Sequence, residues 1–302
     1  MKIDFHAKTD IGLVRKTNED SYGISEMLNL FIVADGMGGY EHGKEASRTV
    51  VNAIRSFIEE KCFSSQSVNE EIVQEAVSMA NSAIQKKVKA LQKVNTTTKM
   101  GSTLVLLVLK PTKCLLSNVG DSRIYLFRDN ALYQKTKDHS LLQESTDQNI
   151  NIADLSGNLK NVITRAIGVG EQVTPDFYYV PPREKDIFLL SSDGLHSLVS
   201  DREIEQIMTS SLSLHDAADR LVEKAKEKGG NDNITICLVK IKELSPKASP
   251  SDSTVSLATP QVENSENAVL EKITRQDWMI IFFIFIFLVL VSSFYYMMIF
   301  KI

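Results

Sequence analysis

The stretch Phe31-Ile32-Val33-Ala34-Asp35-Gly36-Met37-Gly38-Gly39 joins an apolar run to one carboxylate and then to glycines. Four apolar residues bounded by turn residues predict a buried strand, and the glycines predict a tight loop with an exposed backbone. Three further carboxylates stand at strand ends in the same way: Asp121, Asp193 and Asp232. Strand ends and neighbouring strand starts share one edge of an antiparallel sheet, so we expect the four to converge as a metal site.

Composition narrows the class of protein. The 302-residue chain has a formal net charge of −4 and a pI near 5.8, which argues against a nucleic-acid partner. Its three cysteines are too few and too scattered for a disulfide framework or a zinc ribbon, and Cys114 and Cys237 lie in strand-like apolar runs. The start of the chain lacks the apolar core of a secretory signal, so we expect the globular part in a reducing compartment.

The segment from Trp278 to Phe300 carries no charged residue. As a helix it would reach about 34 Å, enough to cross a hydrocarbon core of roughly 30 Å. Trp278 and the Tyr295-Tyr296 pair suit the two membrane interfaces. We therefore expect a single-pass C-terminal tail anchor, with the globular part on the cytoplasmic side, where the chain is synthesised.

The remaining periodicities predict an α+β fold. Period-2 patterns predict mostly antiparallel strands joined by short links, and two amphipathic helices are expected over 43–61 and 68–94, the second begun by a capping box of Ser67 and Glu70. Residues 140–160 predict a short helix followed by an irregular polar insert. The organisation expected is a globular domain over 1–242, a flexible Ser/Pro-rich linker over 243–277, and the anchor over 278–300.

Eight pieces of the chain, in order, resemble the motifs of the bacterial metal-dependent serine/threonine protein phosphatases of the type 2C class. They lie within residues 1–241 and read Arg15-Lys-Thr-Asn-Glu19-Asp20, Val33-Ala-Asp35-Gly-Met-Gly-Gly39, Gly101-Ser-Thr-Leu, Asn118-Val-Gly-Asp121-Ser-Arg123, Asp138-His-Ser, Ile163-Thr-Arg-Ala-Ile-Gly168, Leu190-Ser-Ser-Asp193-Gly-Leu and Gly230-Asn-Asp232-Asn-Ile-Thr. The resemblance implies a central antiparallel β-sandwich flanked by α-helices on both faces, a four-layer arrangement, to which the chain adds its transmembrane helix.

The resemblance also implies a site for two Mn²⁺ or Mg²⁺ ions. Asp35 would bridge them, the Gly36 carbonyl would ligate one, and Asp193 and Asp232 the other. Further members of the implied set are Glu19, assisting through water, Asp121, which with Asp193 resembles the ligands of a third ion, and Arg15, the candidate clamp on the substrate phosphate. Hard oxygen ligands suit these metals, and two close dications would supply a water nucleophile for attack on a phosphate monoester.

Each of these residues also has a structural interpretation. Asp121 fits a hairpin turn, Arg15 a solvated loop charge, and Glu19 with Asp20 a surface acidic pair. His42 and His139 are expected in loops. Nucleophile-based phosphatase motifs are absent from the sequence: it has no Cys-x5-Arg loop and no Asp-x-Asp-x-Thr pattern.

One position departs from the eukaryotic pattern within the family. Eukaryotic members carry a histidine after the Asp-Gly pair as the candidate acid for the leaving alkoxide, and Met37 stands there in this chain, as in many bacterial members. The leaving-group acid is therefore unassigned, with a metal-bound water as the default.

The sequence thus predicts a hydrolase of phosphoserine and phosphothreonine in proteins, with a membrane-linked Ser/Thr kinase or its substrates as partners. Two alternatives stay open: a phosphatase dedicated to one regulatory partner, and a membrane-tethered pseudophosphatase that binds phosphoproteins as a scaffold.

Overall fold

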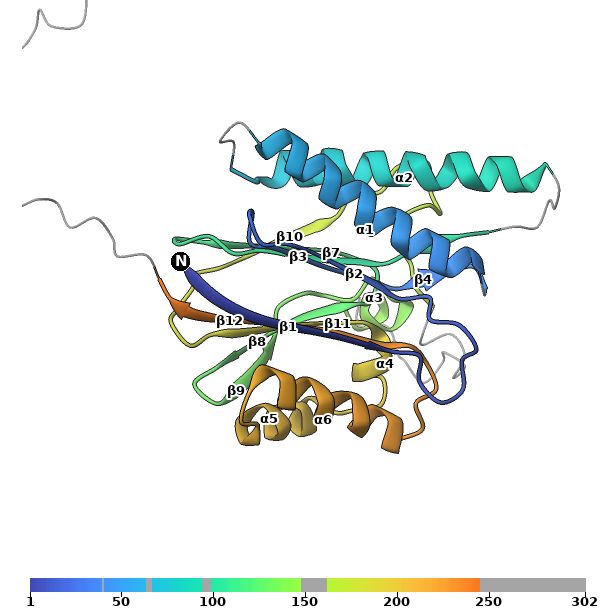
Figure 1. Cartoon of the computed structure of the whole chain (residues 1–302). Coiled ribbons are helices and arrows are strands. Elements are labelled where there is room, and N and C mark those ends of the chain that lie inside the picture. Colours follow the sequence, from blue (N-terminus) through green and yellow to red (C-terminus); the bar gives the residue numbers. More distant parts are fainter. Residues whose placement is uncertain (40, 64–66, 94–98, 148–161, 245–302) are drawn as a thin grey trace, which may run out of the picture. The chain divides into compact units, whose positions relative to one another are not determined.

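The computed structural model describes residues 1–39, 41–63, 67–93, 99–147 and 162–244 (Figure 1). Residues Met1–Lys247 form one compact unit, and Ala248–Ile302 form a second, which lies outside the described residues. The predicted linker and transmembrane anchor fall almost wholly there, so both stay predictions. Among the described helices, none combines the length and apolar character needed to span a bilayer.

Two antiparallel five-stranded sheets form the centre of the domain, as the short links predict. The first sheet has the order β1 (Lys2–Asp10), β12 (Ile234–Glu243), β11 (Ile187–Ser191), β8 (Arg123–Arg128) and β9 (Ala131–Gln134). The second has the order β10 (Asp176–Val180), β7 (Cys114–Val119), β6 (Leu104–Val108), β3 (Leu30–Ala34) and β2 (Ser21–Ser25). The link from β7 to β8 passes from one sheet to the other.

Strand β3 shows how the layers are built. Its five residues are all buried, and their side chains alternate between two cores. Phe31 and Val33 point into the core between the two sheets, whereas Leu30 and Ile32 pack under the helices of the second sheet. A strand buried on both faces reads as a continuous apolar run, which is the pattern seen in the sequence.

Helices cover the outer face of each sheet (Figure 1). The long helices α1 (Glu41–Cys62) and α2 (Glu70–Gln92) pack on the second sheet through residues such as Ile54 and Val73. Helices α4 (Asp193–His196), α5 (Asp201–Ser210) and α6 (Leu214–Glu227) pack on the first sheet through residues such as Leu195 and Leu221. The predicted antiparallel sheets and flanking helices are confirmed. The short helix α3 (Leu141–Asp147) is also present, while residues 148–161 lie outside the described residues.

Three local predictions were wrong. Gly36 is not part of a loop: with Met37 it forms β4, which pairs with β5 (Gly101–Ser102), because the chain continues to pair beyond Asp35. Helix α2 begins after Asn69, whose side chain accepts a hydrogen bond from the Ile72 N–H, so Ser67 is not the cap. His42 lies in α1 rather than in a loop.

Candidate metal centre

The four aspartates expected to converge arrive from both sheets at one end of the sandwich, where Figure 1 places β4 and α4. Asp35 follows β3 of the second sheet, while Asp193 begins α4 directly after β11, and Asp232 precedes β12, both of the first sheet. Asp121 lies in the turn between β7 and β8. The other three carboxylates all act electrostatically on Asp35, so the structure brings the four predicted aspartates together.

The backbone at Asp35 is fixed from the neighbouring strand. The Asp35 N–H donates to Thr103 Oγ1 at 2.9 Å, and the Thr103 N–H donates to the Asp35 carbonyl oxygen at 2.9 Å. Gly36 is buried, and a Cβ atom built on it would overlap the Gly43 carbonyl oxygen in α1. The glycine is therefore required by this close approach of two backbones, beside the carboxylate that the site needs.

Asp20 is a member of the cluster that the sequence analysis did not assign to the site. It is 8% exposed, and the Ser192 hydroxyl donates to its Oδ2 at 2.7 Å. In the β2–β3 hairpin Ser21 pairs with Ala34, so Asp20 stands beside Asp35 at the next position of a register that only the structure reveals. The interpretation of Asp20 as a surface residue was wrong.

Burial and mutual repulsion perturb the acids of this cluster. Burial raises the pKa of Asp20 to about 7 and that of Asp121 to about 7, with the Asp193 carboxylate adding to both shifts. Burial, followed by the neighbouring carboxylates, raises the pKa of Asp35 well above its usual range. Burial and Asp232 also raise the pKa of Asp193. Carboxylates gathered in this way favour either protons or cations among them.

Three buried oxygens, one each from Asp20, Asp121 and Asp193, have no hydrogen-bond partner in the described part of the chain. Buried acceptors without a donor are costly, and a hard cation satisfies carboxylate oxygens directly. No three His, Cys, Asp or Glu side chains of the described ranges already meet as ligands of one ion. Carboxylates that repel one another are expected to stand further apart than the ligands of one ion. The oxygens without a donor therefore indicate the fit to a divalent cation better than the distances between the side chains do.

Arg15 lies at the rim of the cluster. Its Nη2 atom donates to Asp232 Oδ2 at 2.6 Å, and 47% of its side chain remains exposed. Partial burial lowers the pKa of Arg15, but the carboxylates of Asp232, Glu19 and Asp35 outweigh this and raise it. A permanently charged fork that is half exposed beside the acids can reach an anion from solvent.

Glu19 is buried, at 7% exposure. Its carboxylate lies against the backbone of Gly43, and Thr17 Oγ1 is 3.5 Å from Oε1. Its backbone N–H donates to Asn233 Oδ1 at 2.8 Å, and its carbonyl oxygen accepts from the Gly36 N–H at 3.2 Å. Glu19 therefore joins the first loop to β4 and to the segment before β12, beside the cluster. Its predicted action through water stays a prediction.

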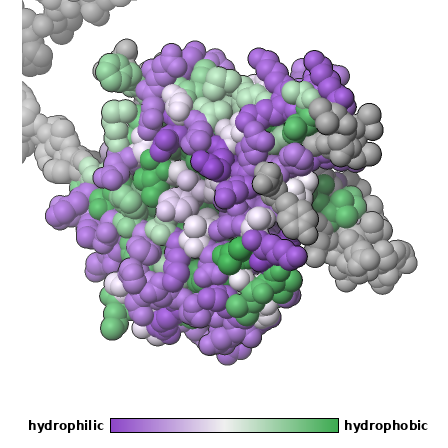
Figure 2. All heavy atoms as spheres, turned by 45° about the vertical axis from the view of Figure 1, so that its right-hand side comes forward, coloured by the Kyte–Doolittle hydropathy of each residue, from purple (hydrophilic) through white to green (hydrophobic). Residues whose placement is uncertain are grey.

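The surface at this end of the molecule is mostly hydrophilic, with apolar side chains in separate groups (Figure 2). Such a surface suits a charged or polar ligand better than an apolar one.

Comparison with known proteins identifies the family. The family described as protein phosphatase 2C matches residues 15–228. The serine/threonine phosphatase stp of Listeria welshimeri is 36% identical over 238 residues, covering 77% of this chain and 93% of that protein. The protein phosphatase PhpP of Streptococcus pneumoniae serotype 2 is 34% identical over 243 residues, covering 78% of this chain and 96% of that protein.

Solved structures agree. The catalytic domain of the serine/threonine phosphatase PstP, solved in complex with two manganese ions, has a TM-score of 0.68 at 32% identity and covers 80% of this chain and 99% of that one.

The chain belongs to the protein phosphatase 2C family. Within that family it is an enzyme of the protein serine/threonine phosphatase class. The roles of the individual site residues stay predictions.

Proposed function

We propose that this protein hydrolyses phosphoserine and phosphothreonine in other proteins, using Mn²⁺ or Mg²⁺ held by the aspartate cluster. The observation that carries the proposal is the convergence of buried aspartates from two sheets, three of whose oxygens find no hydrogen-bond donor among the described residues. The residues proposed to hold the ions are Asp35, Asp193, Asp232, the carbonyl of Gly36, and Asp121 for a third ion. The two manganese ions in PstP support this choice of metal.

When bound, such ions supply a water nucleophile at neutral pH and compensate the charge of the phosphate. The chain itself orients the reactants. Arg15 exchanges its contact with Asp232 for two phosphate oxygens, which places the phosphorus atom over the cluster. Asp20, hydrogen-bonded to Ser192, adds a further carboxyl group next to Asp35 and Asp193. Met37 carries no ionisable proton, so the leaving-group acid is unassigned and water is the default donor.

The test is hydrolysis of a phosphothreonine peptide by the full-length chain, with Mn²⁺ and with excess chelator. Asp35→Asn is expected to lose at least a thousandfold in kcat/KM, because it removes a ligand common to both ions. Asp129→Asn is the matched control: it makes the same chemical change at a turn residue whose side chain is 82% exposed. Hydrolysis that survives both chelation and Asp35→Asn would refute the two-metal mechanism. Peptide binding without hydrolysis by the metal-loaded parent would favour the pseudophosphatase.

We further propose that residues 278–300 tether the catalytic domain to the cytoplasmic face of a membrane, and that a cognate Ser/Thr kinase or its substrates share that membrane. The support is the uncharged apolar segment in the sequence. Replacing Leu288 and Val289 by Arg is expected to move the protein from the membrane fraction to the soluble fraction. Cleavage of the domain by protease added to intact cells would contradict the cytoplasmic orientation.

A further inference from the structure

The short turn that carries Asp121 has a constrained backbone at Gly120. Gly120 has φ +100°, and a Cβ atom on it would lie 2.7 Å from the Thr103 side chain. Asp121 Oδ1 is buried and has no hydrogen-bond partner among the described residues, so hydrogen bonds to that atom do not fix the carboxylate. The carboxylate accepts a hydrogen bond from the backbone of Asp121 itself, so its position depends on what holds the turn.

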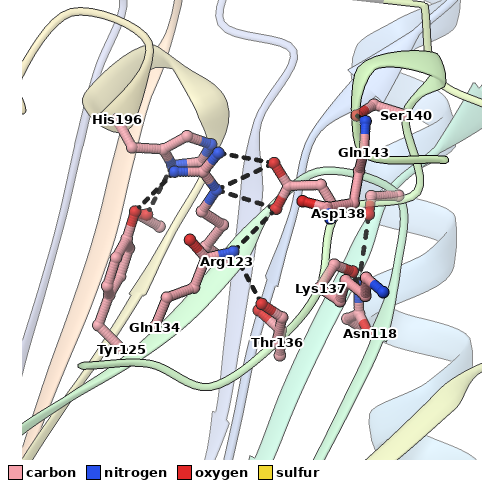
Figure 3. Close-up of polar contacts among 12 residues, drawn as sticks. Asn118, Arg123, Tyr125, Gln134, Thr136, Lys137, Asp138, Ser140, Gln143 and His196 are labelled. Carbon is pink, nitrogen blue, oxygen red and sulfur yellow. Dashed lines mark hydrogen bonds and ion pairs between the residues drawn. The ribbon is translucent and has the colours of Figure 1, made fainter. Parts of the chain in front are cut away.

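Residues 136–139, which we name the strap, cross this turn between β9 and α3. Three strap residues bind its two flanks (Figure 3). The Ile124 N–H donates to Thr136 Oγ1 at 2.9 Å, and Asn118 Nδ2 donates to the Lys137 carbonyl oxygen at 2.8 Å. Asp138 forms a two-pronged ion pair with Arg123, with Nε–Oδ1 at 2.9 Å and Nη2–Oδ2 at 2.7 Å. The strap is thus fixed on both strands that lead into the turn.

The fourth strap residue, His139, binds the turn itself. The Gly120 N–H donates to His139 Nδ1 at 3.0 Å, and the His139 N–H donates to the Gly120 carbonyl oxygen at 2.9 Å. Both polar groups of Gly120, the residue before Asp121, are therefore satisfied by one residue. An acceptor at Nδ1 means that the neutral ring carries its proton on Nε2. Burial lowers the pKa of His139, which agrees with a neutral ring.

Two further contacts orient this arrangement. His139 Nε2 lies 3.2 Å from Asp176 Oδ2, at an alignment poorer than that of a regular hydrogen bond, and Arg165 Nη1 lies 2.5 Å from the other oxygen of Asp176. His196 hydrogen-bonds to the backbone of Asp121. Two histidines thus hold this turn through its backbone, His139 at Gly120 and His196 at Asp121.

We propose that His139 is a positioning residue for Asp121. By binding the N–H and the carbonyl oxygen of Gly120, it sets where the Asp121 carboxylate stands relative to Asp193. That position in turn sets how tightly the cluster binds its most weakly held divalent ion. The proposal rests on the proposed function, because it takes Asp121 as a ligand. Groups that hydrogen-bond to a metal ligand and orient it, without touching the metal, commonly change metal affinity by about 10- to 100-fold.

The test is Mn²⁺ binding to the full-length chain without substrate, measured by titration calorimetry and by the electron paramagnetic resonance signal of free Mn²⁺. His139→Ala is expected to weaken the weakest site about tenfold or more. His139→Asn is expected to stay within about threefold of the parent, because Asn Oδ1 occupies the same place along the side chain as His Nδ1 and accepts the same bond. His139→Gln carries its acceptor one carbon further out and is expected to resemble His139→Ala.

Two controls separate positioning from stability. Arg128→Ala breaks a buried ion pair with Asp186 elsewhere in the first sheet and should lower the melting temperature without changing Mn²⁺ affinity. Amide hydrogen exchange at Gly120 should accelerate in His139→Ala and His139→Gln but not in Arg128→Ala or His139→Asn.

The outcomes distinguish the proposals. Suppose first that Asp121→Asn weakens Mn²⁺ binding. The positioning role is then overturned if His139→Ala binds Mn²⁺ like the parent, or if His139→Asn binds Mn²⁺ no more tightly than His139→Gln. If His139→Ala does not fold, the comparison of His139→Asn with His139→Gln decides. If Asp121→Asn binds Mn²⁺ like the parent, the ligand role of Asp121 is wrong and the positioning role is overturned with it, while the sites at Asp35 and Asp193 are unaffected.

Discussion

Without divalent metal, this protein should lose stability as pH rises from 6 to 8. Asp20 and Asp121 each have a pKa raised to about 7 in the folded chain, first by burial and then by neighbouring carboxylates. The ordinary pKa of an aspartate is 3.8. Between these two values the folded state binds more protons than the unfolded state, so the free energy of unfolding falls as pH rises. Above the folded pKa the penalty is complete and the curve becomes flat.

The magnitude follows from the same linkage. From pH 6 to pH 8, a carboxyl whose folded pKa is near 7 loses about 1.4 kcal/mol of stability. Two such groups lose roughly 3 kcal/mol, and the raised pKa values of Asp35 and Asp193 act in the same direction. For a domain of this size, that loss corresponds to a decrease of the melting temperature on the order of 10 °C.

The assay is urea and thermal unfolding of the full-length chain at pH 6, 7 and 8, in chelator and in excess Mn²⁺. Mn²⁺ binds the charged carboxylates of the folded state, so it should remove the decrease or reverse it. Asp20→Asn should reduce the slope in chelator by the contribution of one of these acids, at most about half, whereas Asp129→Asn should leave it unchanged. Metal-free stability that is flat or rises between pH 6 and pH 8 would show that these acids are not buried together as described.

Three substitutions test other parts of the structure. Arg15→Ala should raise KM for a phosphothreonine peptide about tenfold while kcat changes little, and an unchanged KM would argue against the phosphate clamp. Gly36→Ala should lower the free energy of unfolding by about 3 kcal/mol, because its methyl group overlaps the Gly43 carbonyl; a loss below about 1 kcal/mol in urea unfolding would contradict the close approach. Asn69→Ala should cost about 1 kcal/mol as the cap of α2, whereas Ser67→Ala should have almost no effect, and equal losses would refute the assignment of Asn69.

Much of the fold follows from the sequence, because burial repeats along strands and helices with fixed periods. The alternation of β3 between two cores and the apolar stripe of α2 are local patterns of this kind. The positions of Asp35, Asp193 and Asp232 at strand ends also suffice to predict their convergence, because antiparallel strands bring their ends to common edges. The order of eight motifs then identifies the class of enzyme.

Other features depend on register and on close approach between distant segments. Asp20 joins the cluster because the β2–β3 pairing places it beside Asp35. The pairing of β4 with β5 and the hold of His139 on Gly120 join residues far apart in the chain.

The sequence by itself therefore predicted antiparallel strands, helices on the outside of a sheet and the convergence of four aspartates from local periodicity and residue chemistry, while the order of its motifs indicated the class by resemblance. Only the tertiary structure decided which side chains turn inward and what holds them there. A one-residue change of register inverts every side chain of a strand, and local sequence does not encode the partner strand that sets it.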